Sequence, residues 1–168
     1  TEHPDRIAML HGRAAKWLSE NGYVDLAIEH ALASGNNDDA AALVQASWLQ
    51  YVDSGLGSTV RGWVQALRAS GAAENVNTMV TASWMAALSG EIDEMRQLLK
   101  QLSSTSSNGL LPDGAQSVES SVALIRGLFG FEGPVEMLAA ARRAAELETD
   151  GNTRWYGAAN TALGHASY

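Results

Sequence analysis

Four histidines are the residues of this chain best suited to metal binding or acid–base catalysis: His3, His11, His30 and His165. No two of them stand four positions apart, the spacing that puts two ligands on one face of a helix, and none lies in an H-E-x-x-H run. The chain has no cysteine. Disulfides, thiol catalysis and cysteine-ligated zinc are therefore excluded. We predict no metal site.

The acidic residues cluster where helices are expected to begin. Asp38 and Asp39 form one such cluster, and Glu91, Asp93 and Glu94 form another. Carboxylates near a helix N-terminus are stabilised by the helix dipole, which explains both clusters without chemistry. No Ser/His/Asp order and no nucleophile elbow occurs. An α-helical enzyme domain remains a third hypothesis, but we predict no catalytic residue and no enzyme.

The aromatic residues offer flat surfaces on which a ligand can stack. All five tryptophans, Trp17, Trp48, Trp63, Trp84 and Trp155, lie on apolar stripes, so core packing is the first interpretation for each. Ligand or partner binding is the alternative. Tyr51 and Trp63 flank the break "DSGLGS", and Trp155 and Tyr156 are adjacent on a helix, so both cannot face one core. These four residues are the predicted binding candidates.

The elements that carry these residues all have helical periodicity. Glycines or polar runs separate the apolar stripes. The expected helices cover about 4–21, 24–32, 36–52, 58–67, 74–89, 92–102, 118–129, 134–145 and 155–166. Short turns make neighbouring helices antiparallel, and stacked hairpins bury a continuous core. The sequence thus predicts an all-α fold: a TPR-like right-handed α-solenoid of antiparallel helical hairpins, about nine helices in one domain, 1–168.

A glycine-to-alanine spacing supports the hairpin repeat. Gly22 precedes Ala27, and Gly35 precedes Ala40, by five positions each. Glycine reverses the chain at positive φ, and alanine lets the next helix approach closely. The low-complexity run 103–114 is predicted to be a mobile loop. The last helix stripe, with Leu163, is expected to expose an apolar strip through which the chain can self-associate.

The charge balance limits the classes of partner. Eleven basic against nineteen acidic residues give a net charge of −8. An acidic surface repels nucleic-acid phosphates and anionic lipids. No signal peptide or membrane span is evident, so we expect a cytoplasmic protein. The chain begins with Thr1 rather than Met. We therefore expect a fragment of a larger protein.

One stretch resembles a known family. Leu10 to Val44, "LHGRAAKWLSENGYVDLAIEHALASGNNDDAAALV", is similar to the segment that follows the ATPase and winged-helix part of MalT-like LuxR-family transcriptional regulators. The shared residues are Leu10, His11, Ala14, Ala15, Trp17, Gly22, Ala27, Ile28, His30, Ala31, Leu32, Gly35, Ala40 and Ala41. Looser similarity continues through "STVRGWVQAL", "VTASWMAALSGEIDEMRQLLKQL" and "RRAAELETDGNTRWYGAANTALGHASY". The Leu-Pro ending usual after the first of these is replaced by "LRAS".

The resemblance implies a helical, TPR-like sensor arm that takes up a small-molecule inducer or a protein partner and helps control self-association. It implies structural roles for His11 and His30. ATP would belong only to an upstream domain, because the chain has no G-x-x-x-x-G-K-[ST] loop. No cofactor and no direct nucleic-acid contact are expected. The alternative is a TPR-like protein-interaction scaffold with no small-molecule ligand.

Overall fold

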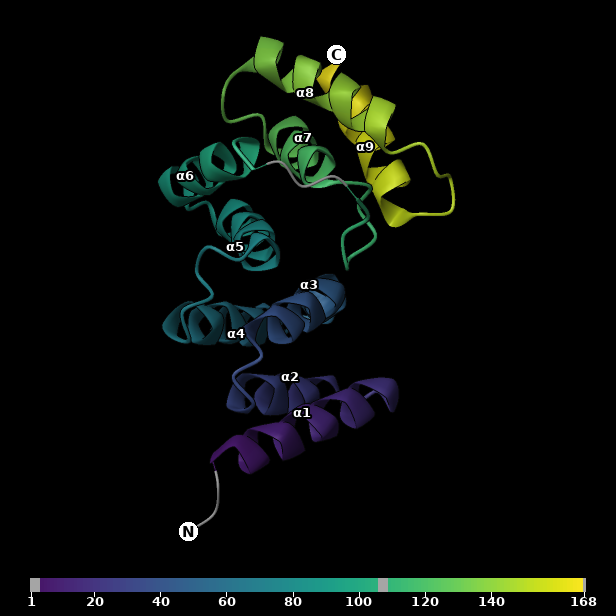
Figure 1. Ribbon diagram of the computed structural model, residues 1–168. Coiled ribbons are helices and arrows are strands. Elements are labelled where there is room, and N and C mark those ends of the chain that lie inside the picture. The colour runs from purple at the N-terminus through teal and green to yellow at the C-terminus, as the bar shows by residue number, and fades with distance from the viewer. Residues whose placement is uncertain (1–3, 106–108, 168) are drawn as a thin grey trace. The chain divides into compact units, whose positions relative to one another are not determined.

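The computed structural model describes residues 4–105 and 109–167, which form nine α-helices and no strand (Figure 1). The helices are α1 (Pro4–Glu20), α2 (Val24–Ala33), α3 (Asn37–Asp53), α4 (Gly57–Ala69), α5 (Val76–Ser89), α6 (Ile92–Ser103), α7 (Val118–Phe129), α8 (Pro134–Leu147) and α9 (Arg154–Ala166). The predicted all-α fold of consecutive helical hairpins is confirmed for these residues. None of the helices within them is long and apolar enough to cross a lipid bilayer.

The ends of several helices follow from residues that the sequence places there: glycines, a capping asparagine and a proline. Gly22 and Gly35 have φ values of 81° and 76°, as the hairpin interpretation predicts. The Asn36 side chain caps α3 by accepting a hydrogen bond from the backbone N–H of Asp39 at 3.2 Å. Pro134 stands in the first turn of α8, where its missing N–H costs nothing.

Two predicted helix starts are wrong. α4 begins at Gly57 with Leu56 as its N-cap, one residue before the expected start at about 58. α5 begins at Val76 rather than Glu74. Its start is set by Asn75, whose side-chain oxygen accepts hydrogen bonds from the N–H groups of residues 77 and 78 at 2.9 and 3.3 Å. An Asx cap therefore outweighs the helix propensity of the preceding glutamate.

The chain divides into two compact units, residues 1–81 and 82–168. In the first unit α1 packs on α2, α2 on α3, and α3 on α4. Ala27 and Ala40 are fully buried there, as the glycine-to-alanine spacing predicts. The single-domain assignment stays a prediction.

The second unit contains the end of α5 and helices α6 to α9. α7 packs on α6 and α8, and α9 lies against both α7 and α8 (Figure 1). Trp155, Ala159 and Ala162 of α9 are buried in this cluster, and Leu163 is partly covered. The prediction of an exposed apolar strip on the last helix is therefore wrong, because α9 folds back against α7 and α8.

The predicted loop 103–114 includes residues 106–108, which lie outside the described residues. Ser103 completes α6. Leu111 is only 6% exposed, whereas Leu110 is 69% exposed. The backbone N–H of Leu111 donates to the carbonyl of Ala115 at 2.8 Å. The mobility of this loop stays a prediction.

Candidate functional site

The first predicted pair, Tyr51 and Trp63, is brought together by the α3–α4 hairpin. Their ring centroids lie 4.6 Å apart in an edge-on arrangement. Trp63 is 8% exposed, and Tyr51 is partly exposed. Burial, followed by the charge of Asp25 and a side-chain hydrogen bond to it, raises the pKa of Tyr51 above its ordinary value of 10.0. The pair is a packed contact whose hydroxyl is already occupied.

The second predicted pair does not form one site. Trp155 is 3% exposed, stacks on Trp84 with centroids 5.1 Å apart, and donates its indole N–H to the carbonyl of Asp113 at 2.9 Å. Tyr156 is 41% exposed and points away from that core. The adjacent-position argument thus holds: one residue of the pair is core and the other is surface.

Trp17, which the apolar stripe of α1 places in the core, is instead 57% exposed. It stacks on the exposed ring of Tyr23, with centroids 6.2 Å apart and 15° between the planes. Leu10 and Ile7, which share the helical spacing of Trp17 in α1, are also exposed. The stripe is apolar as predicted, but α2 covers only the Ala15 side of α1.

The two histidines of the first hairpin face each other. Their Nδ1 atoms lie 2.9 Å apart, so one ring donates and the other accepts, and this contact ties α1 to α2. This fits the structural role that the family resemblance implies for His11 and His30. Across residues 4–105 and 109–167 no group of three or more histidine, aspartate or glutamate side chains is placed to hold a metal ion.

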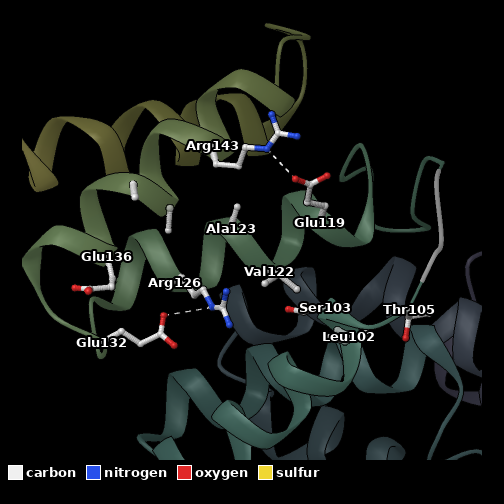
Figure 2. Close-up of a pocket in the computed structure, with 12 residues that line it drawn as sticks. Leu102, Ser103, Thr105, Glu119, Val122, Ala123, Arg126, Glu132, Glu136 and Arg143 are labelled. Carbon is white, nitrogen blue, oxygen red and sulfur yellow. Dashed lines mark hydrogen bonds and ion pairs between the residues drawn. The ribbon is translucent and has the colours of Figure 1, made fainter.

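A hollow in the second unit is a feature that the sequence does not predict. It has a volume of about 580 Å³ and is bounded by the end of α6, by α7, by the α7–α8 turn and by α8 (Figure 2). Its lining has five apolar residues and seven that are charged or hydroxylic: Leu102, Ser103, Thr105, Glu119, Val122, Ala123, Arg126, Glu132, Glu136, Ala139, Ala140 and Arg143. Alanines on the floor leave the room that larger side chains would fill.

The charged lining residues stand at two ends of this hollow, which we call the α6–α8 hollow. At one end Arg143 of α8 donates to Glu119 of α7 at 2.8 Å and to Glu146 at 3.0 Å. These two hydrogen bonds raise the pKa of Arg143 further above its already high value. At the other end Arg126 lies 3.4 Å from Glu132, and Glu136 stands beside them (Figure 2). The Nε atom of Arg126 is buried and makes no hydrogen bond.

The positions of these charges follow from helix geometry. Glu119 and Arg126 are seven residues apart on α7, and Glu136 and Arg143 are seven apart on α8. Two helical turns separate each pair, so both members share one face. Each helix has glutamate in its first turn, as the dipole favours, and α7 also has Arg126 in its last turn, whereas the last turn of α8 has no basic residue. Because the helices are antiparallel, Glu119 of α7 meets Arg143 of α8, while Arg126 of α7 lies at the Glu136 end and pairs with Glu132 of the turn. These i, i+7 pairs are the sequence signal for the hollow.

Two close contacts hold α7 and α8 in place beneath the hollow. A Cβ added to Gly127 would lie 2.9 Å from the Cα of Ala141, so only glycine permits this approach. At the other end of α8, the fully buried carboxylate of Glu148 accepts a hydrogen bond from the N–H of Gln116 at 2.9 Å and a short one from the hydroxyl of Ser120. Glu148 thereby ties the end of α8 to the start of α7.

Comparison with known proteins gives a partial match. The chain is 33% identical over 79 residues to serine/threonine-protein kinase PknK from two strains of Mycobacterium tuberculosis and from Mycobacterium bovis. That stretch is 47% of this chain and 7% of each kinase, so the match spans a small part of those proteins. No protein-family model matches the chain. No solved structure gives a significant match.

The α6–α8 hollow is suited to binding rather than to reaction. Each of its guanidinium groups is already paired with carboxylate, and its hydroxyls are engaged with the α6 backbone: Ser103 donates to the carbonyl of Leu99 at 2.7 Å, and Thr105 to that of Gln101 at 3.1 Å. An apolar floor with polar groups at defined ends is the usual form of a small-ligand site.

Proposed function

We propose that this chain is a ligand- or protein-binding regulatory module, of the kind that MalT-like LuxR-family transcriptional regulators carry as a helical sensor arm. The observation that carries this proposal is the α6–α8 hollow, an open space of about 580 Å³ on a scaffold of helical hairpins. That volume lies within the range of small-molecule sites. The residues shared with the family segment between Leu10 and Val44 support the assignment.

In this proposal the chain senses and does not catalyse. Any ATPase and any DNA-binding domain would reside elsewhere in a parent protein that works in the cytoplasm, and the module would act by binding an inducer or a protein partner. The partial match to PknK supports a module within a much larger protein, because the matched stretch is 7% of those kinases. The name of those kinases assigns no kinase activity to this chain.

A thermal-shift screen of metabolites tests the binding proposal. At a ligand concentration one hundred times its Kd, binding to the folded state stabilises it by about 2.7 kcal/mol, which is a shift of several degrees in Tm. Filling the hollow by Ala140→Leu should abolish the shift while leaving the helices intact. If no compound changes the Tm of the native chain, the alternative of a ligand-free TPR-like scaffold replaces the sensor.

The parent gene tests the family assignment separately. A G-x-x-x-x-G-K-[ST] motif encoded upstream and a helix-turn-helix encoded downstream would place the chain in a MalT-like regulator. A parent gene that lacks both would remove that assignment and leave the binding module without it.

A further inference from the structure

The hairpin α1–α2 presents two apolar stripes to solvent. Each stripe repeats the three- and four-residue spacing that lines one face of a helix. The α1 stripe is Ile7, Leu10, Ala14 and Trp17, and the α2 stripe is Tyr23, Leu26, His30 and Ala33. The four largest members of the pair, Leu10, Trp17, Tyr23 and Leu26, are each between 46% and 57% exposed. We call these eight residues the first-hairpin face.

The two stripes are joined into one surface by two contacts between α1 and α2. Near the turn, the ring of Trp17 stacks on that of Tyr23 with centroids 6.2 Å apart. Further along, His30 of the α2 stripe meets His11, which follows Ile7 by one helical turn, at 2.9 Å between the Nδ1 atoms. The face is therefore continuous across the hairpin.

The size of this surface matches a small protein interface. An aromatic side chain contributes about 150–250 Å² when it is fully buried, so the half-exposed rings and leucines together present roughly 500 Å². Two such faces packed together would bury roughly 1,000 Å² in total, which is near the lower limit of specific interfaces. Apolar patches of this kind on soluble proteins mark interaction sites.

The charges that border the face have opposite signs on the two helices. Arg13 borders the α1 stripe, four residues before Trp17, and Glu29 borders the α2 stripe, three residues after Leu26. Both side chains are exposed. Because the helices are antiparallel and the two histidines meet, Arg13 and Glu29 lie within about 1.5 Å of the same level along the hairpin.

We propose that the first-hairpin face is a two-fold docking surface for a second copy of this chain. A two-fold axis parallel to the helices places α1 of one copy on α2 of the other without moving either helix along its length. Arg13 then meets Glu29 of the partner subunit, and this pairing occurs twice. The apolar stripes are buried between the two pairs, in a four-helix arrangement.

A lipid surface fits the same face less well. Residues 4–33 hold three basic side chains and four acidic ones, so the hairpin as a whole is not attracted to anionic lipids. A membrane would also leave Glu29 without a partner, whereas a second copy supplies one for each charge. This proposal does not rest on the α6–α8 hollow or on the ligand-binding function proposed for it.

Sedimentation of the 168-residue chain over a range of concentrations tests the pairing. With a Kd on the order of 0.1 mM, the chain should be largely monomeric at about 10 µM and largely dimeric at about 1 mM. Leu10→Glu should raise the Kd at least about tenfold, because pairing would then bury an unpaired carboxylate. Lys100→Glu, an exposed charge on α6, is the control and should pair as the native chain does.

A charge exchange tests the two-fold arrangement itself. Arg13→Glu and Glu29→Arg should each raise the Kd about tenfold, because like charges then face each other in both pairs. An equimolar mixture of the two variants should associate with the native Kd, since each copy of the mixed dimer supplies the charge that the other lacks. Both positions are exposed, and melting curves will show that each variant is folded.

Three results would overturn the proposal: a chain that stays monomeric at about 1 mM, tenfold above the expected Kd, a dimer indifferent to Leu10→Glu, or a mixture that associates no better than its components. A monomeric chain that instead sediments with phosphatidylserine vesicles would also overturn it and assign the face to a lipid surface. None of these results changes ligand binding in the α6–α8 hollow, so the two proposals fail by different results.

Discussion

The first hairpin, α1–α2, and the cluster α7–α9 are built from similar amphipathic helices but use their apolar faces differently. In α1 the stripe that contains Leu10 and Trp17 is more than half exposed. In α9 the corresponding stripe is buried, with Trp155 at 3% exposure. The difference is one of neighbours: among the residues that the structure describes, α1 packs mainly on α2, whereas α9 lies against both α7 and α8.

The contact between helices also differs in the two regions. Gly12 of α1 has room for a side chain, since an added Cβ would meet only the Cβ of Ser34 at 3.9 Å. Gly127 of α7 has none, because its added Cβ would lie 2.9 Å from the Cα of Ala141. Gly127 is thus required for the close spacing of α7 and α8, whereas Gly12 is dispensable in α1.

The largest expected difference between the two regions is in the free energy of unfolding when a tryptophan of each is replaced by alanine. Trp155→Ala should lower the free energy of unfolding by about 3–5 kcal/mol, because it removes a buried ring and its hydrogen bond. Trp17→Ala should change it by less than about 1 kcal/mol, since the ring is mostly in solvent already. Urea unfolding of both variants measures this. Similar losses in the two would mean that the face of α1 is covered in solution.

The same glycine substitution in the two regions should have opposite signs. Gly127→Ala is expected to destabilise by about 1–3 kcal/mol, as overpacking forces α7 and α8 apart. Gly12→Ala should stabilise by up to about 1 kcal/mol through helix propensity. Thermal melts of the pair measure this. A stabilising Gly127→Ala would show that the close approach of the helices is not tight.

The turn of the first hairpin gives a smaller effect. Gly22 has a φ of 81°, where a β-branched side chain is strained. Gly22→Val should therefore cost at least about 1 kcal/mol. Gly22→Asn is the matched control and should cost less, because asparagine tolerates the left-handed region. Equal stabilities for the three proteins would mean that the turn relaxes freely.

Particular residues show how far the sequence alone could go. Every predicted helix exists, and Gly22, Gly35, Asn36 and Pro134 end or begin helices as their chemistry dictates. The spacing of apolar residues predicts which face of a helix is apolar. It does not report whether another helix covers that face, and this is why the predicted surroundings of Trp17 and of the strip around Leu163 are wrong.

The candidate site was harder to predict than the fold. Tyr51 and Trp63 do meet, but as a packed pair, and Trp155 is core. The α6–α8 hollow depends on which charges of two separate helices lie opposite each other, and that register is fixed by the Gly127–Ala141 contact. The i, i+7 glutamate–arginine pairs are visible in the sequence, but helix-dipole stabilisation explains Glu119, Arg126 and Glu136 equally well there.

The smallest expected effect contrasts the aromatic pairs of the two units. The Trp84–Trp155 stack has no titratable group, whereas the Tyr51–Trp63 pair contains a phenol. Burial first, and Asp25 second, raise the pKa of Tyr51 in the folded chain above its ordinary value of 10.0. The stability gained in this way is fully present below the ordinary pKa and is lost as the pH rises through the raised one.

As the pH rises above about 10, the free energy of unfolding should therefore fall more steeply in the native chain than in Tyr51→Phe. Subtracting the two curves isolates the contribution of Tyr51 from that of the other titratable groups. Asp25→Asn should reduce this difference without abolishing it, because desolvation by burial is the larger cause and remains. Complete loss in Asp25→Asn would mean that the carboxylate, and not burial, is the main cause of the raised pKa. Parallel curves for the native chain and Tyr51→Phe would show that the phenol is as free in the folded state as in the unfolded one. The Tyr51–Trp63 pair would then be looser than the Trp84–Trp155 stack.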